Sequence, residues 1–387
     1  MNRSIAGIGG KFCAGMGFFV LFLMLVLNAQ VQALAGNLPV KKVVDAAGNT
    51  VVIPNGVKHI ICSGSGCLRL VTYLNAQDLV VGVDDIEQRN TQFDARPYAV
   101  ANPQFKDLPI FGGFRGRDTP EKIITLPVIP QVIFKVQGST GIDPGKLSRK
   151  TGIPVIILKY GDLVHDRQDF YNALTILGHA LDKEERAKEV IAFFNGQIQE
   201  LADRTGKVPQ GQKKSCFVGG IAYRGPHGFQ STEPRYPPFE FVNALNIARS
   251  ADNAPEPGQS NFSKEKILTL DPQVLFLDLA TLQMGDFQGG LHELKTDPVY
   301  QGLTAVKNGE VFGVLPYNWY AQNFGSVIAD SWFVGKILYP DEFADIDPEK
   351  KADEIYTFLL SEPVFQNMNQ GFNRMVFQRI NLKPKEQ

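Results

Sequence analysis

One segment of the chain occurs twice, and this repeat constrains the fold more than any other feature of the sequence. The segment "EKIITLPVIPQVIF", residues 121–134, returns as "EKILTLDPQVLF", residues 265–276, with two residues fewer before the Pro-Gln-Val. Each copy follows an apolar run that carries a cysteine and ends in glycines, at Cys62 and at Cys216. Chance similarity between two amphipathic helices that lead into strands is the simpler alternative. The repeat favours an internal duplication, with two copies of one α/β lobe.

Short apolar runs bounded by Gly, Pro and Asn predict strands in both halves. They lie at residues 51–54, 59–62, 78–83, 130–134, 154–158 and 215–220. Continuous apolar strands separated by helices are typical of a parallel sheet covered on both faces. Between the halves, residues 167–204 place apolar and charged residues at helical spacing, which predicts one long helix with a break near Asp182. We therefore expect an α/β fold of two Rossmann-like lobes joined by a long interlobe helix, with a ligand cleft between the lobes.

The N-terminal 35 residues have the pattern of a secretory signal. Arg3 and Lys11 precede an apolar run at residues 12–27, and Ala33-Leu34-Ala35 fits a cleavage site. An uncleaved membrane anchor is the alternative. The expected division is residues 1–35 as signal peptide, 36–164 as N-terminal lobe, 165–206 as interlobe helix and 207–387 as C-terminal lobe. The expected location is the periplasm.

Charge and cysteine content exclude some classes of partner. Without residues 1–35 the chain has 37 basic and 40 acidic residues, because Arg3 and Lys11 are two of the 39 basic ones, so its formal charge is −3. Nucleic acid is therefore not an expected partner. Cys62, Cys67 and Cys216 remain. Cys62 and Cys67 allow a disulfide, a thiolate contact to a metal, or two reduced packing residues.

Motifs of catalysis and of bare metal binding are incomplete. The segment "GSGCLR" lacks the third glycine of a dinucleotide-binding loop, and "SGSG" is one residue out of register with a nucleophile turn. The five histidines are scattered along the chain, whereas zinc and manganese sites need several ligands that converge. We expect a binding protein without intrinsic cofactor, and no enzyme.

The order and spacing of several segments resemble one family. The segments are "VVDAAGNTVVIP", "HIICSGSGCLRLVTYLNAQDLVVGV", "PEKIITL", "TGIPVIILKYGD", "SKEKILTLDPQVLFL" and "ILYPDEF". They resemble the periplasmic substrate-binding proteins of iron-siderophore, haem and vitamin B12 ABC transporters, the class with a single-helix hinge. The resemblance implies capture of an iron chelate of siderophore or haem type, or of a related metal complex, and its delivery to a permease and, through it, to an ATPase. A corrinoid receptor and a sensory module that presents a ligand are the alternatives.

The same resemblance implies a docking residue on each lobe. The family docks a glutamate of each lobe onto arginines of the permease, and the matching "EKI" positions here are Glu121 and Glu265. Two like charges, one on each lobe, form a two-point contact that can recognise a paired permease. Acidic residues are also favoured in the first turn of a helix without any partner.

Candidate ligand residues follow from the loops expected at the ends of the parallel strands. Arg115 and Arg117 can bind carboxylates, catecholates or phosphate-like groups through paired hydrogen bonds. Trp319, Tyr320 and Tyr223 offer flat faces for a macrocycle or an aryl chelate, and His227 or Tyr223 is a candidate axial contact to a chelated metal. The full set of expected ligand residues is Ser63, Gly64, Ser65, Gly66, Cys67, Arg115, Arg117, Tyr160, Tyr223, Arg224, His227, Trp319 and Tyr320. Cys67 is expected to face the cleft.

Overall fold

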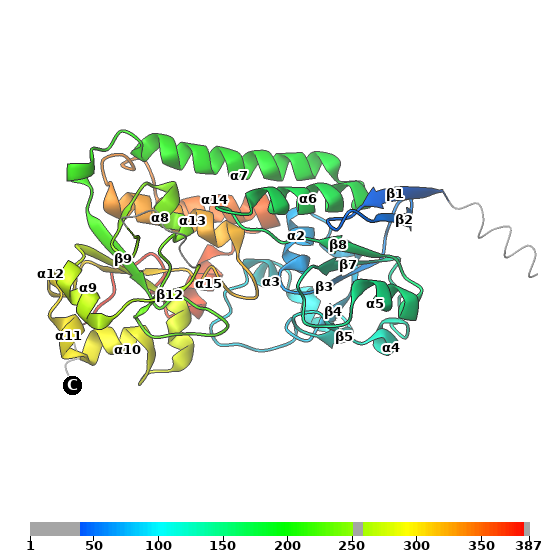
Figure 1. The fold of residues 1–387 in the computed structure, drawn as a ribbon, viewed down its shortest axis with the longest axis horizontal. Coiled ribbons are helices and arrows are strands. Elements are labelled where there is room, and N and C mark those ends of the chain that lie inside the picture. Colours follow the sequence, from blue (N-terminus) through cyan, green and yellow to red (C-terminus); the bar gives the residue numbers. More distant parts are fainter. Residues whose placement is uncertain (1–38, 251–257, 383–387) are drawn as a thin grey trace, which may run out of the picture.

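The computed structural model describes residues 39–250 and 258–382, in which two lobes lie side by side along the long axis (Figure 1). The predicted signal segment, residues 1–35, lies outside the described residues. The predicted α/β fold with two lobes is confirmed. Among the helices of the described residues, none has the length and apolar character needed to span a membrane.

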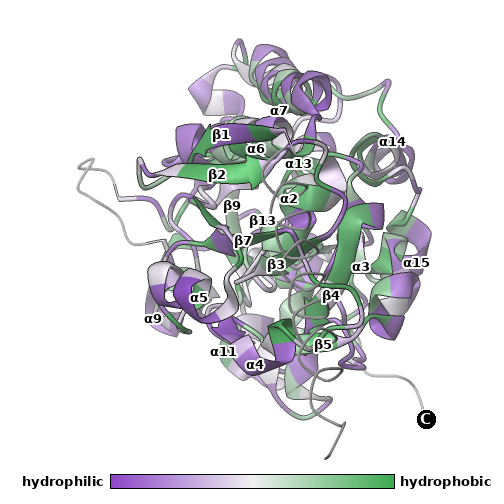
Figure 2. Ribbon diagram, turned by 90° about the vertical axis from the view of Figure 1, so that its right-hand side faces the viewer, coloured by the Kyte–Doolittle hydropathy of each residue, from purple (hydrophilic) through white to green (hydrophobic). Residues whose placement is uncertain are grey.

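The N-lobe is built on a six-stranded sheet with the order β6-β5-β4-β3-β7-β8, in which all strands run parallel except β6. Its strands are β3 (Ile60–Ser63), β4 (Val80–Asp84), β5 (Ile110–Gly113), β6 (Arg117–Asp118), β7 (Val132–Val136) and β8 (Val155–Leu158). The helices are α2 (Cys67–Tyr73), α3 (Pro97–Ala101), α4 (Pro120–Ile123) and α5 (Pro144–Thr151). Figure 2 shows hydrophobic residues along β4 in the interior and hydrophilic ones along α5 and α7 outside.

The C-lobe repeats this plan with a four-stranded parallel sheet in the order β11-β9-β13-β14. Its strands are β9 (Ser215–Gly219), β11 (Leu245–Asn246), β13 (Val274–Asp278) and β14 (Val311–Val314), and a separate ribbon pairs β10 (Ser231–Thr232) with β12 (Ser260–Asn261). The helices are α8 (Pro237–Phe241), α9 (Lys264–Leu270), α10 (Gly289–Thr296), α11 (Pro298–Gln301), α12 (Thr304–Asn308), α13 (Phe324–Leu338), α14 (Pro348–Leu360) and α15 (Phe365–Gly371).

The two copies of the sequence repeat occupy equivalent places. In each lobe the glutamine of the Pro-Gln-Val segment binds the chain at the start of the first parallel strand, β3 or β9. Gln131 Oε1 accepts from His59 N at 3.1 Å, and Gln273 Oε1 accepts from Ser215 N at 3.0 Å. Val132 then lies opposite Ile60, and Val274 opposite Cys216. Cys216 therefore corresponds to Ile60 and not to Cys62, two residues further along β3. The repeated cysteines mark equivalent strands but not equivalent positions.

One predicted strand pairs differently in the structure, whereas the predicted break in the long helix near Asp182 is present. Residues 51–54 form a strand, but it pairs antiparallel with β1 (Val40–Val44) as β2 (Thr50–Pro54), outside the parallel sheet. The predicted long helix is two helices, α6 (Arg167–Leu181) and α7 (Glu184–Thr205), because Asp182 adopts a left-handed backbone with φ 56°. Of these two helices, α7 is the one that runs along both lobes (Figure 1).

An aromatic cluster joins the lobes beneath α7. Phe324 of α13 lies 4.1 Å from Phe170 of α6 and 5.0 Å from Tyr160, measured between ring centroids. The Tyr73 hydroxyl of α2 also contacts the C-lobe, where it accepts from Gly325 N at 3.3 Å. Because separating the lobes would expose these rings to water, their burial stabilises the contact between the lobes.

Candidate functional site: an interlobe cleft

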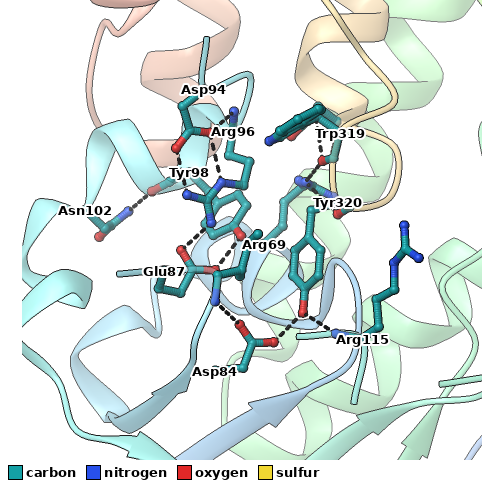
Figure 3. Close-up of polar contacts among 12 residues, drawn as sticks. Arg69, Asp84, Glu87, Asp94, Arg96, Tyr98, Asn102, Arg115, Trp319 and Tyr320 are labelled. Atoms are coloured by element: carbon teal, nitrogen blue, oxygen red, sulfur yellow. Dashed lines mark hydrogen bonds and ion pairs between the residues drawn. The ribbon is translucent and has the colours of Figure 1, made fainter. Parts of the chain in front are cut away.

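The carboxyl ends of both parallel sheets face each other, and one C-lobe loop crosses to the N-lobe at this place. The loop follows β14 and comprises residues 317–323, which we call the crossing loop. Tyr320 and Ala321 within it have left-handed backbones, with φ 51° and 66°. Non-glycine residues in this conformation require support from the surrounding structure, and the N-lobe supplies it (Figure 3).

Arg69 of α2 is the main N-lobe contact of the crossing loop. Its guanidinium is buried and donates to the carbonyl oxygens of Gln322 at 2.8 Å, Tyr320 at 3.2 Å and Trp319 at 3.3 Å. The Tyr160 hydroxyl donates to the same Gln322 oxygen at 2.7 Å. The hydroxyl of Tyr160, a predicted ligand residue, is therefore bound to the crossing loop.

Tyr320, also predicted, connects the crossing loop to the end of β4. Its hydroxyl donates to Asp84 and accepts from Arg115 N at 3.2 Å, as Figure 3 shows. Burial raises the pKa of Asp84 to about 7, although the Tyr320 hydrogen bond opposes this rise. Trp319 is half-buried and packs against the core of the molecule.

An arginine hairpin forms the N-lobe rim of the cleft. Strands β5 and β6 pair antiparallel, and residues 114–116 form the turn between them. The Phe114 ring is surrounded by the guanidinium carbons of Arg89, Arg115 and Arg117, at 4.4, 5.2 and 5.5 Å from its centroid. Arg115 and Arg117 are exposed and form no ion pair with any described residue, whereas Arg89 pairs with Asp85 at 2.8 Å. Two free guanidinium groups at a cleft rim are suited to an anion.

The glycine loop after β3 forms the adjoining wall. Gly64 and Gly66 have φ angles of 91° and 82°, and a Cβ atom on either would lie within 2.3 Å of Ser139 or Tyr160. Ser65 is half-buried, whereas Ser63 is buried and donates to Asp118 at 2.6 Å. Only glycine fits these two positions.

The cysteines are not part of the cleft. Cys67 is completely buried, and its Sγ lies 3.5 Å from the Phe134 carbonyl oxygen, so the prediction that Cys67 faces the cleft is wrong. Cys62, Cys67 and Cys216 are free thiols. Burial raises the pKa of Cys62 well above its usual value, with further contributions from Cys67. Of the three alternatives for Cys62 and Cys67, the structure has two reduced packing residues.

The remaining predicted residues lie on the C-lobe loop after β9. Tyr223 and Arg224 are exposed, and the Arg224 guanidinium lies 5.3 Å from the Tyr223 ring. His227 Nε2 lies 2.8 Å from the Tyr223 carbonyl oxygen, which closes a tight turn. Arg224 has φ 56°, as Arg115 has φ 62°, so a cleft loop of each lobe presents an arginine from a left-handed position.

A cavity of about 380 Å³ also opens between the lobes. It is lined by Thr91, Gln92 and Phe93 from the N-lobe and by Leu282, Gln283, Gly285, Asp286 and Asn373. The N-lobe wall belongs to the segment held by a buried network in which Glu87 accepts from Arg96 at 2.9 Å and from Tyr98 at 2.6 Å. Within the part of the chain that the structure describes, no three His, Cys, Asp or Glu side chains converge as metal ligands.

Several residues at the site were not predicted from the sequence. Arg69 and Lys135 are charged residues within otherwise apolar segments, "CLRLVTYL" and "VIFKV", and both are buried. The loop at residues 137–141 packs against the arginine hairpin, since Thr140 N donates to Arg115 O at 3.0 Å. A charged residue in the middle of an apolar strand or helix is rarely buried without a partner, so this pattern could have indicated that Arg69 and Lys135 make specific contacts.

Glu233 at the base of the crossing loop makes stability depend on pH. The Tyr317 hydroxyl donates to Glu233, and burial raises the pKa of this carboxyl to about 8. The folded state then holds the proton more tightly than the unfolded chain, so the contribution of Glu233 to stability is complete below the usual glutamate pKa and is lost as pH rises through about 8. We expect a lower thermal midpoint at pH 8.5 than at pH 5.5, by circular dichroism. Glu233→Gln should reduce this slope, and an unchanged slope would contradict the assignment.

Two lobes with facing strand ends, a long helix along both and a cationic rim are typical of two-lobed solute-binding proteins. The chain matches the family described as periplasmic binding protein over residues 60–316, and it belongs to that family. The prediction of a binding protein rather than an enzyme is confirmed by this membership.

Named relatives bind different solutes. The chain is 21% identical to the molybdate-binding protein MolA of Haemophilus influenzae over 356 residues, 87% of this chain and 94% of MolA. The structure of MolA bound to molybdate matches with a TM-score of 0.62 and 18% identity, over 84% of this chain and 98% of that one. The Fe(3+)-citrate-binding protein YfmC of Bacillus subtilis is 25% identical over 159 residues, 41% of this chain and 46% of YfmC. The haem-binding protein HutB of Vibrio cholerae matches with a TM-score of 0.53 and 18% identity, over 73% of this chain and 99% of that one.

Proposed function

We infer that this chain is the periplasmic solute receptor of an ABC transporter and that its solute is an anionic metal species, foremost an iron chelate. The arginine hairpin carries this inference. Arg115 and Arg117 leave two guanidinium groups without acidic partners among the described residues, at the rim of a cleft between two lobes. Guanidinium groups recognise carboxylate, catecholate and oxyanion oxygens through paired hydrogen bonds.

The arginines favour some solutes over others. A ferric carboxylate or catecholate chelate, or haem through its propionates, presents the negative oxygens that Arg115 and Arg117 would bind. A corrinoid offers less negative charge, so the hairpin favours it less. Molybdate is the second candidate, because MolA resembles nearly the whole length of the chain. Tyr223 and His227 remain the proposed contacts to a chelated metal, and Trp319 and Tyr320 the proposed aromatic wall.

The solute can be identified directly. The protein purified from its native host would be analysed by absorption spectroscopy and by metal analysis, then titrated with ferric citrate, molybdate, haem and cobalamin by calorimetry. Co-purified iron or molybdenum, or tight binding of an anionic solute, is the expected result. Tight binding of cobalamin alone, or of none of the four, would contradict the inference.

The proposed permease contacts occupy equivalent positions on the two lobes. Glu121 and Glu265 are exposed in the first turns of α4 and α9. Ile124 and Leu268 follow three residues later in the repeat and are 46% and 43% exposed. Figures 1 and 2 show α4 and α9 both on the side of the molecule away from α7. Each lobe thus exposes one acidic and one apolar residue. This pair suits a partner with two similar surfaces, each of which carries a basic and an apolar group.

Loss of both docking glutamates should separate transport from binding. We expect Glu121→Ala with Glu265→Ala to lower solute uptake at least about tenfold, because both charged contacts to the permease are lost. Solute affinity should stay unchanged, since neither residue lies at the cleft. Uptake into proteoliposomes that hold the permease and the ATPase would measure this. Glu185→Ala with Glu189→Ala on α7 is the matched control. Normal uptake by the docking variant would refute the assignment and leave a sensory role open.

A further inference from the structure

A buried lysine connects the two N-lobe loops that line the cleft. Lys135 of β7 is 2% exposed, and its ammonium group donates to Ser63 Oγ at 3.0 Å, to Gly116 O at 3.1 Å and to Asp118. Ser63 also donates to Asp118 at 2.6 Å. The lysine thus binds the end of β3, just before the glycine loop, and both the turn and the second strand of the arginine hairpin.

The contacts of Lys135 lie next to the two free arginines. Gly116 stands between Arg115 and Arg117, and Asp118 follows Arg117. The other contacts of the turn go to loops: Phe114 N donates to Asp85 at 2.8 Å, Thr140 donates to Arg115 O from its N at 3.0 Å and its Oγ1 at 3.1 Å, and Arg115 N donates to Tyr320 of the crossing loop at 3.2 Å. Lys135 is the contact that joins the turn to the central sheet.

The duplication provides an internal comparison for this lysine. Ser63 lies opposite Lys135 in the N-lobe, and at the same register Gly219 lies opposite Leu277 in the C-lobe. By the alignment of the two "EKI" segments, Asp118 corresponds to Phe262. At the three corresponding places the C-lobe therefore has a glycine, a leucine and a phenylalanine instead of a buried ion pair with a serine. Burying a lysine and an aspartate is costly unless both are paired, so the lobe fold alone does not account for them.

We propose that Lys135 is a positioning residue that holds Arg115 and Arg117 in place for the solute. It acts through Gly116 and Asp118 and does not itself contact the solute. The proposal rests on the proposed function as far as solute binding by these arginines is concerned. A site held in advance loses less conformational entropy when it binds.

The test replaces Lys135 by the residue that the C-lobe uses. In Lys135→Leu with Asp118→Leu, both buried charges are removed together, so the thermal midpoint should stay close to that of the wild type. Amide hydrogen exchange of residues 112–118, followed by mass spectrometry, should become at least about tenfold faster, while residues 219–225 stay unchanged. Affinity for the probes ferric citrate and molybdate, measured by calorimetry at 10 °C, should fall at least about tenfold for whichever probe the wild type binds.

The outcomes distinguish the positioning role of Lys135 from the proposed solute class. Wild-type exchange rates in residues 112–118 overturn the positioning role, whatever the variant binds. Faster exchange together with wild-type affinity for a probe also overturns the positioning role, because the order of the arginine hairpin would then not affect solute binding. A wild-type protein that binds neither probe excludes ferric citrate and molybdate as its solute, while the exchange rates still decide whether Lys135 orders the hairpin. The Lys135→Arg variant keeps the positive charge and the hydrogen-bond donors. Its residues 112–118 should therefore exchange more slowly than those of the Lys135→Leu, Asp118→Leu variant.

Discussion

Replacing Arg115 and Arg117 together by alanine is expected to lower the affinity for the anionic solute by about 100-fold. Each charge-assisted hydrogen bond to an anion contributes about 1.5–3 kcal/mol, and each tenfold change in affinity corresponds to about 1.4 kcal/mol. Both side chains are exposed, so their loss should leave the fold intact. Calorimetric titration with the solute that the wild type binds would measure the change, and the thermal midpoint would verify folding.

The control for this variant must match its change in charge. Lys146 and Arg149 lie on α5, where both are exposed, and neither belongs to the loops at the cleft. Lys146→Ala with Arg149→Ala should therefore bind almost as the wild type does. Raising the salt concentration should weaken wild-type binding more than binding by the hairpin variant, because salt screens exposed charges. Equal losses in both double variants would show that only net charge matters and would refute the site.

Replacing Arg96 by methionine is expected to destabilise the protein by about 3–5 kcal/mol, as removal of one partner of a buried ion pair usually does. The side chains of Arg96 and Glu87 are 1% and 2% exposed, with 2.9 Å between Nη1 and Oε2. A second contact joins Arg96 to Asp94 at 2.7 Å. Burial already raises the pKa of Glu87, and Arg96 is the main group that opposes this rise. Urea unfolding at pH 7 would measure the free energy of unfolding.

Two further variants test the cause of this loss. Arg89→Met removes a half-exposed ion pair with Asp85 and should cost about 1 kcal/mol or less. Glu87→Gln in the Arg96→Met background removes the unpaired buried charge and should restore part of the stability. If Arg96→Met and Arg89→Met destabilised the protein equally, the buried network would not hold the segment that lines the interlobe cavity.

The architecture of the fold was largely predictable from local patterns. Apolar runs at residues 59–62, 130–134, 154–158 and 215–220 became parallel strands because strands covered on both faces need continuous apolar residues. The repeat identified equivalent elements, down to the glutamines that clamp β3 and β9. The break between α6 and α7 was visible only as an interruption of a helical pattern. The pairing of residues 51–54 with β1 was not predicted, because an apolar run indicates a strand but not which other strand it pairs with.

The candidate site was predictable only in part. Arg115, Arg117 and the glycines at 64 and 66 were predicted because loops after parallel strands form the cleft of such folds, and they lie on such loops in the structure, while their role in solute binding stays a prediction. Tyr160 was assigned to the solute, yet its hydroxyl binds Gln322, 162 residues further along the chain. Cys67 was expected at the cleft, but α2 turns it towards β7. A loop position predicts nearness to a cleft, whereas the direction of a side chain depends on the elements packed against it.

The amino-acid sequence by itself determined two duplicated lobes, their parallel strands and the arginine pair, because these depend on apolar periodicity and on turn residues close together in the chain. The tertiary structure alone decided that Cys216 corresponds to Ile60, that Arg69 holds the crossing loop some 250 residues away, and that Lys135 binds two loops at once. Strand register and the packing of distant segments set these contacts. Both are properties of the folded chain that no local pattern encodes.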